Sequence, residues 1–141
     1  MYRWWGEGGY SLILTGNVMI EVDQLEAAGN AIIPRGAPFE GEGFERFRAL
    51  AAAAKAHGSI VAMQLSHPGR QVSSQIQARP ISASDVKLEG EVLGLTFARP
   101  QSMERAGFDG IIDGFAHAAE YAHKCGYDGE QLHAAHGYLL A

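Results

Sequence analysis

The sequence is poor in the features that mark several large classes of protein. It has one cysteine, Cys125, which excludes an intrachain disulfide framework and is typical of a reducing compartment. Its 11 basic residues are outnumbered by 16 acidic ones, so the net charge of −5 provides no basic patch for nucleic acid. No apolar run is long enough to span a membrane, and Met1–Gly6 lacks the apolar segment of a secretory signal. We therefore expect a soluble, cytoplasmic protein that binds neither nucleic acid nor membranes.

Glycine-rich phosphate-binding loops are also absent. Neither G-x-G-x-x-G nor G-x-x-x-x-G-K-[ST] occurs, although the chain has 18 glycines. The composition is otherwise that of a globular protein, because 47% of the residues are apolar and only 19% are charged. A chain of 141 residues is long enough for one domain with its own core.

Apolar segments of two periodicities alternate along the chain. Short, nearly continuous apolar runs are typical of strands buried on both faces, and apolar residues at helical spacing predict amphipathic helices. The stretch 66–100 is rich in proline, serine and glycine, which predicts a long loop with a small hairpin. The expected strands are Ser11–Thr15, Ser59–Leu65 and Gly129–His133, and the expected helices are Phe39–His57 and Gly110–Lys124.

This alternation of strands and helices predicts an α/β protein built from parallel βαβ units. Two folds compete, an open doubly wound sheet and part of a (β/α)₈ TIM barrel, and the absence of phosphate-binding loops disfavours the first. Polar groups follow the expected strands at Thr15–Asn17, at Gln64 and His67, and at His133 and His136. Such groups mark the active end of a barrel, although open α/β sheets also bind ligands there. A complete barrel takes roughly 250 residues, so three strands are less than half of one.

Four motifs occur in a fixed order: Leu14–Met19, Gln64–Gln71, Pro80–Ser84 and His133–Leu140. Together they resemble the Old Yellow Enzyme family, which are FMN-dependent NAD(P)H:flavin oxidoreductases, or ene-reductases, built on a (β/α)₈ barrel. The resemblance implies FMN and NAD(P)H as cofactors and an electron-poor alkene as the small-molecule substrate. It also implies that residues 1–141 form a single incomplete barrel domain, roughly strands 2 to 4 with their helices, without the family's first strand and C-terminal half.

The resemblance makes Gly16, Gln64 and His133 the candidates for cofactor binding. An amide at the mouth of a strand offers donors and acceptors that suit the edge of a flavin pyrimidine ring, which is the role implied for Gln64. Gly16 would let the backbone approach the flavin closely. The alternatives are a glutamine satisfied by backbone groups and a plain turn glycine. His67 and Arg70 match motif positions too, and we expect them to organise the loop through hydrogen bonds, unless Arg70 meets an anionic group.

His133, His136 and Tyr138 are the candidates for catalysis. The imidazoles lie three residues apart where a strand gives way to a turn, so both rings can hold a carbonyl or nitro oxygen and stabilise negative charge there. In the family's reaction, hydride passes from NAD(P)H to flavin and from flavin to the alkene β-carbon. The resemblance implies that the Tyr138 phenol then protonates the α-carbon. The alternatives are a metal-binding histidine pair, which lacks further zinc ligands, core or surface histidines, and a tyrosine that packs against Leu139 and Leu140.

Glu130 departs from the family pattern, because it lies in the third expected strand where an apolar residue is expected. Strand alternation directs Glu130 at the layer between strands and helices if His133 faces the site. An unpaired buried carboxylate costs several kcal/mol, so it is tolerated only where that layer is open. Unpaired edges of an incomplete barrel also favour self-association. Two alternative functions follow: an inactive truncated fragment that acts through interactions, and a barrel fragment that binds a metal instead of flavin.

Overall fold

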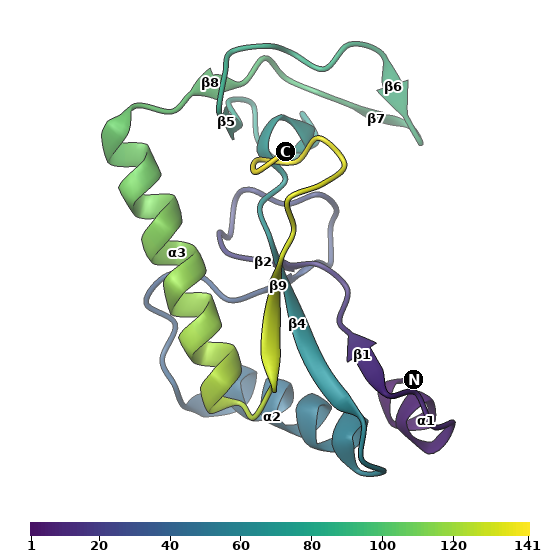
Figure 1. Cartoon of the computed structure of the whole chain (residues 1–141). Coiled ribbons are helices and arrows are strands. Elements are labelled where there is room, and N and C mark those ends of the chain that lie inside the picture. The colour runs from purple at the N-terminus through teal and green to yellow at the C-terminus, as the bar shows by residue number, and fades with distance from the viewer.

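The computed structural model describes all of residues 1–141 and centres on a parallel sheet (Figure 1). β4 (Ile60–Ser66) is the middle strand. β1 (Leu12–Leu14) and β2 (Val18–Met19) pair with successive parts of β4, and β9 (Gly129–Leu132) pairs with its other side. β3 (Ala31–Ile32) extends the sheet beyond β2. Every pair in this sheet is parallel, which confirms the predicted α/β class.

Two long helices cover one face of this sheet. α2 (Gly41–Lys55) connects the first part of the sheet to β4, and α3 (Arg105–Lys124) precedes β9. A short N-terminal helix, α1 (Tyr2–Glu7), packs against α2 and was not predicted from the sequence. Gly6 makes this contact possible, because a Cβ at that position would lie 2.5 Å from the carbonyl oxygen of Ala54.

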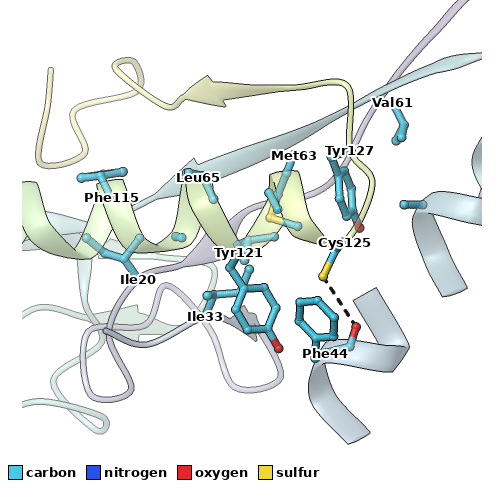
Figure 2. Close-up of a cluster of buried hydrophobic side chains, with 14 of the residues drawn as sticks. Ile20, Ile33, Phe44, Val61, Met63, Leu65, Phe115, Tyr121, Cys125 and Tyr127 are labelled. Carbon is cyan, nitrogen blue, oxygen red and sulfur yellow. Dashed lines mark hydrogen bonds between the residues drawn. The ribbon is translucent and has the colours of Figure 1, made fainter. Parts of the chain in front are cut away.

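The core lies between β4 and the two long helices (Figure 2). Alternate residues of β4, Val61, Met63 and Leu65, point into it and are fully buried. Two aromatic side chains, Phe44 of α2 and Tyr121 of α3, pack edge to face with their ring centroids 5.1 Å apart. Just beyond α3, the thiol of Cys125 donates to the carbonyl oxygen of Phe44 at 3.6 Å. Burial raises the pKa of this thiol to about 11, so it stays protonated and unreactive at neutral pH.

The ends of the helices test the predicted boundaries. α2 agrees with the prediction, and Gly58 just beyond it adopts a left-handed conformation with φ of 90°. α3 begins at Arg105, so the prediction that it starts at Gly110 was wrong. Gly107 and Gly110 lie inside the helix rather than before it. Gly110 has a packing reason to be there, because a Cβ would lie 3.1 Å from the Arg35 guanidinium.

The face of the sheet away from the helices is open. The prediction that the first strand is buried on both faces was wrong, because only Ile13 of β1 is buried and Leu12 and Leu14 are 56% and 39% exposed. The physical reason is that helices cover one face of these strands and no part of the chain covers the other. A groove of about 320 Å³ runs along β1, between its side chains and those of Trp5 and Tyr10.

Glu130 of β9 points in the expected direction. Glu130 pairs with Met63 of β4, and partners in a parallel register direct their side chains to the same face, here the face that holds the core. β9 is the edge strand of the sheet, however, so the carboxylate reaches solvent and forms no ion pair. The cost of burying it therefore does not arise in this chain.

The segment between β4 and α3 forms a separate layer above the carboxyl end of the sheet (Figure 1). A 3₁₀ turn, Gly69–Gln71, comes first, and β5 (Ile81–Ser82) later pairs in parallel with β8 (Gln101–Ser102). β6 (Glu91–Val92) and β7 (Leu95–Thr96) form the small hairpin that the sequence predicted. No helix of the chain combines the length and apolarity needed to cross a membrane.

Asp128 links the end of α2 to the sheet and makes stability depend on pH. Its carboxylate accepts from Lys55 Nζ at 2.6 Å and from the Val61 amide at 2.9 Å. These two hydrogen bonds lower the pKa of Asp128. The pKa is lower in the folded state, so the stabilisation is present above the unfolded value of about 3.9 and is lost as the pH falls through the folded value. We expect Asp128→Asn to lose about 1 kcal/mol at pH 7 and almost nothing relative to wild type below that folded value.

Urea unfolding of the wild type and Asp128→Asn at pH 7 and in acid would measure this difference. Asp109→Asn is the matched control, because Asp109 is exposed and forms no ion pair. The same difference between wild type and Asp128→Asn at both pH values would contradict the expectation.

Candidate functional site

The open face of the sheet carries polar side chains near the carboxyl ends of β4 and β9. Gln64 and Gln131 are paired in the register of the two strands, and Gln64 Nε2 donates to Gln131 Oε1 at 2.6 Å. The same face continues to His133, whose amide donates to the Leu65 carbonyl oxygen at 2.9 Å. These residues line a cavity of about 330 Å³ together with Leu132, Ala134, Ala135 and His136. Gln131 was not recognised from the sequence, because nothing distinguishes it from a surface residue of a strand.

The three predicted catalytic residues come together, and two of them, His133 and His136, line this cavity. The ring of His133 lies 5.1 Å from that of His136 and 4.8 Å from that of Tyr138, measured between centroids. A tight turn brings the phenol back toward the imidazoles, because His136 and Gly137 both adopt left-handed conformations, with φ of 59° and 72°. His133 and Tyr138 are buried, and His136 is exposed. No group of three or more His, Cys, Asp or Glu side chains is arranged to hold a metal ion.

The surroundings set the protonation of these groups. Burial, followed by the neighbouring His136, lowers the pKa of His133, and the Glu26 carboxylate opposes that shift. The ring of His133 is therefore neutral at pH 7 and offers one N–H donor. Burial raises the pKa of Tyr138 to about 12, and the Glu26 carboxylate beside the phenol contributes to the rise. The phenol consequently keeps its proton over the physiological pH range.

Glu26 belongs to the site although no sequence pattern pointed to it. It is half-buried and accepts from Asn17 Nδ2 at 2.7 Å, so the amide that follows β1 holds the carboxylate in place. Asn17 was recognised as a polar group at the end of a strand. Glu26 lies in an irregular segment between β2 and β3, where no periodicity predicts the direction of a side chain.

Gly16 lies at the carboxyl end of β1 and is exposed. A Cβ added there would meet no atom within 4 Å, so the space in front of the backbone is free. The Gly16 amide donates to the Tyr2 hydroxyl at 3.1 Å, and the preceding Thr15 hydroxyl accepts from the Gln64 amide at 2.9 Å. The first contact joins the end of β1 to α1 and the second joins it to β4, and no direct contact joins Gly16 to the histidines.

The motif that begins at His67 organises the loop after β4, as expected. His67 is buried, and its Nδ1 accepts from the Gly69 amide at 3.0 Å. The other ring nitrogen, Nε2, therefore carries the hydrogen and faces Glu21 Oε2 at 3.2 Å. Arg70 is half-buried and its side chain forms no hydrogen bond or ion pair, so of these two motif residues only His67 organises the loop.

The sequence pattern of the NADH:flavin oxidoreductase / NADH oxidase family matches residues 6–141. The chain belongs to this family. Among its relatives is the NADH-dependent flavin oxidoreductase nadA of Aspergillus parasiticus, which is 55% identical over 139 residues. That alignment covers 99% of this chain and 31% of the relative, so the chain spans about a third of the relative's length.

Solved structures agree with the family assignment at the level of the fold. A crystal structure of TcOYE superposes with a TM-score of 0.84 at 23% sequence identity, covering 99% of this chain and 41% of TcOYE. The old yellow enzyme homologue from Zymomonas mobilis gives a TM-score of 0.79 at 25% identity, covering 98% of this chain and 39% of its own. The resemblance to the Old Yellow Enzyme family is thus confirmed, and the parallel sheet matches part of that barrel.

Proposed function

We propose that this chain carries the substrate-binding and proton-donating half of an FMN-dependent NAD(P)H oxidoreductase that reduces electron-poor alkenes. The observation that carries the proposal is the convergence of the His133, His136 and Tyr138 rings beside a cavity that Gln64 and both histidines line. The proposal also assigns three parts of the sheet to roughly strands 2 to 4 of the barrel: β1 together with β2, then β4, and then β9. The curated relative named above is NADH-dependent, which supports a nicotinamide reductant here.

The residues around the cavity fit FMN. The contact between Gln64 and Gln131 uses one N–H of the Gln64 amide, which leaves a second N–H and the carbonyl oxygen for a ligand. The free space at Gly16 allows a flat ring to approach the backbone. Gln64, Gly16 and His133 would hold the flavin. When bound, FMN supplies the hydride that reduces the alkene.

His133 and His136 would bind the oxygen of the substrate's electron-withdrawing group. Both rings face the cavity, and a hydrogen bond from each would stabilise the negative charge that develops on that oxygen. Tyr138 would then donate its proton to the substrate carbon. Its raised pKa keeps the proton in place until a carbanion-like centre forms nearby, as general acid catalysis requires.

Flavin binding tests this proposal directly. We expect FMN to comigrate with the purified chain on gel filtration with a perturbed visible spectrum. Gln64→Ala should weaken its binding about tenfold, since it removes roughly one or two hydrogen bonds. Gln75→Ala is the matched control, because Gln75 is exposed on the loop after β4 and its side chain forms no hydrogen bond. A colourless wild-type protein after gel filtration would overturn the proposal.

The second candidate is an inactive fragment that acts through interactions. It is favoured by the uncovered apolar side chains of Leu12, Leu14 and Ile60. It is also favoured by the outer edge of β9, because β9 pairs with β4 on one side only. Unpaired edges and exposed apolar faces promote association between chains. Light scattering on the same column would distinguish the two candidates, since a colourless oligomer supports the fragment and a flavin-loaded monomer supports the enzyme.

A further inference from the structure

We propose that Gln71, together with the His67 turn, is a positioning element that fixes the backbone on both sides of Tyr138. This inference rests on the proposed function, because that function makes Tyr138 the proton donor whose position the contacts would hold. The segments that contain Gln71 and Tyr138 lie side by side at the carboxyl end of the sheet (Figure 1). A hydrogen bond joins Gln71 to His136, which is 65 positions further along the chain.

Gln71 holds the segment before Tyr138. Its Nε2 donates to the backbone carbonyl oxygen of His136 at 2.6 Å. That carbonyl belongs to the left-handed turn at His136 and Gly137, which needs an outside partner because both residues depart from regular backbone conformations. Gly137 fits closely under the same amide, since a Cβ at that position would lie 3.2 Å from Gln71 Nε2.

The His67 turn holds the segment after Tyr138. The Leu139 amide donates to the His67 carbonyl oxygen at 3.1 Å. Gly69 allows this approach, because a Cβ there would lie 3.0 Å from both the nitrogen and the Cα of Leu139. The turn is itself rigid, since the buried His67 ring bonds to the Gly69 amide on one side and faces Glu21 on the other.

These contacts restrain the loop that carries the phenol, and the groups that make them lie outside the cavity. Neither Gln71 nor His67 lines the cavity at Gln64 and His133, so both act through the loop rather than on a substrate. A proton donor must be held within a fraction of an ångström of its acceptor to be effective. A shift of the His136 carbonyl would move the phenol and the His136 ring, while Gln64 stays in place on β4. We call the two contacts, Gln71 with His136 and His67 with Leu139, the clamp. Loss of the clamp should therefore slow protonation of the substrate and leave flavin binding unchanged.

The substitution Gln71→Glu tests the clamp with little change in shape. Glutamate has the size of glutamine but cannot donate, and its charge would repel the His136 carbonyl oxygen. Gln71→Lys restores a donor and is the matched rescue. We expect hydrogen exchange at the Leu139 amide of the full chain to speed up about tenfold in Gln71→Glu and to stay within about twofold of wild type in Gln71→Lys. Unchanged exchange in Gln71→Glu would overturn the proposal.

A second readout connects the clamp with the chemistry. In flavin-loaded protein, Gln71→Glu should lower kcat for alkene reduction about tenfold and leave the rate of flavin reduction by NADH within about twofold of wild type. Equal losses in both half-reactions would assign Gln71 to general stability and overturn its positioning role. If the wild type binds no flavin, the proposed function fails, and hydrogen exchange at Leu139 still decides whether the clamp exists.

Discussion

Tyr138→Phe is expected to lower alkene reduction by roughly 100- to 10,000-fold while flavin reduction by NAD(P)H continues near the wild-type rate. Phenylalanine keeps the ring that packs against His133, so the change removes the proton and little else. The phenol would act only after hydride has left the flavin, which is why the two half-reactions should separate. Stopped-flow spectroscopy of flavin reduction and of its reoxidation by an electron-poor alkene would measure both rates.

Tyr127→Phe is the control for this substitution. This substitution also removes one phenol hydroxyl, but the Tyr127 hydroxyl is buried in the core and has no hydrogen-bond partner. Removing it should leave both half-reactions unchanged and the fold at least as stable, since no bond is broken. Reoxidation by the alkene at the wild-type rate in Tyr138→Phe would show that another group or solvent protonates the substrate.

Met63→Ala is expected to have the largest effect on stability. Met63 is fully buried at the centre of the core, between β4 and the two long helices (Figure 2). Truncating such a residue costs about 2 to 5 kcal/mol, because transfer energy is lost and a cavity remains. Since small domains are stable by only about 5 to 15 kcal/mol, this loss is a large share of the total free energy of unfolding. Chemical denaturation followed by circular dichroism would measure the change.

Met63→Leu separates the loss of volume from the change of side chain. A substitution that conserves volume usually costs less than about 1.5 kcal/mol, so the leucine variant should unfold near the wild-type midpoint. Coincident unfolding curves for the alanine variant and the wild type would show that the core around Met63 contributes little to stability.

Periodicity predicted the elements that have a regular repeat. The strands at Ser59–Leu65 and Gly129–His133 and the helix Phe39–His57 appear within about two residues of the predicted ends. β2 and β3 were not predicted, because a strand of two residues is too short to show a periodic pattern. The start of α3 was not predicted, because glycines such as Gly107 and Gly110 usually interrupt a helix. In the structure both lie inside the helix, where they leave room for the side chains of Met103 and Arg35.

The candidate site was predictable where one short segment holds several reactive groups. His133, His136 and Tyr138 lie within six residues, so their closeness in the sequence already predicts that the rings lie near one another. Glu26 reaches the site from an irregular segment, and only the folded chain reveals its position. The exposure of Leu12 and Leu14 was not predictable either, because an apolar pattern reports what a strand is suited to contact and not what covers it.

The alternation of side chains along β4 divides two properties between neighbouring positions. Met63 and Leu65 face the helices and hold the fold together, whereas Gln64 between them faces the cavity. Neighbouring residues of one strand therefore serve the core and the cavity lining separately, because successive side chains of a strand point to opposite faces. Substitutions at Gln64 can change the shape and polarity of the cavity while the packing of Met63 and Leu65 stays the same, so the cavity lining can vary without loss of the core.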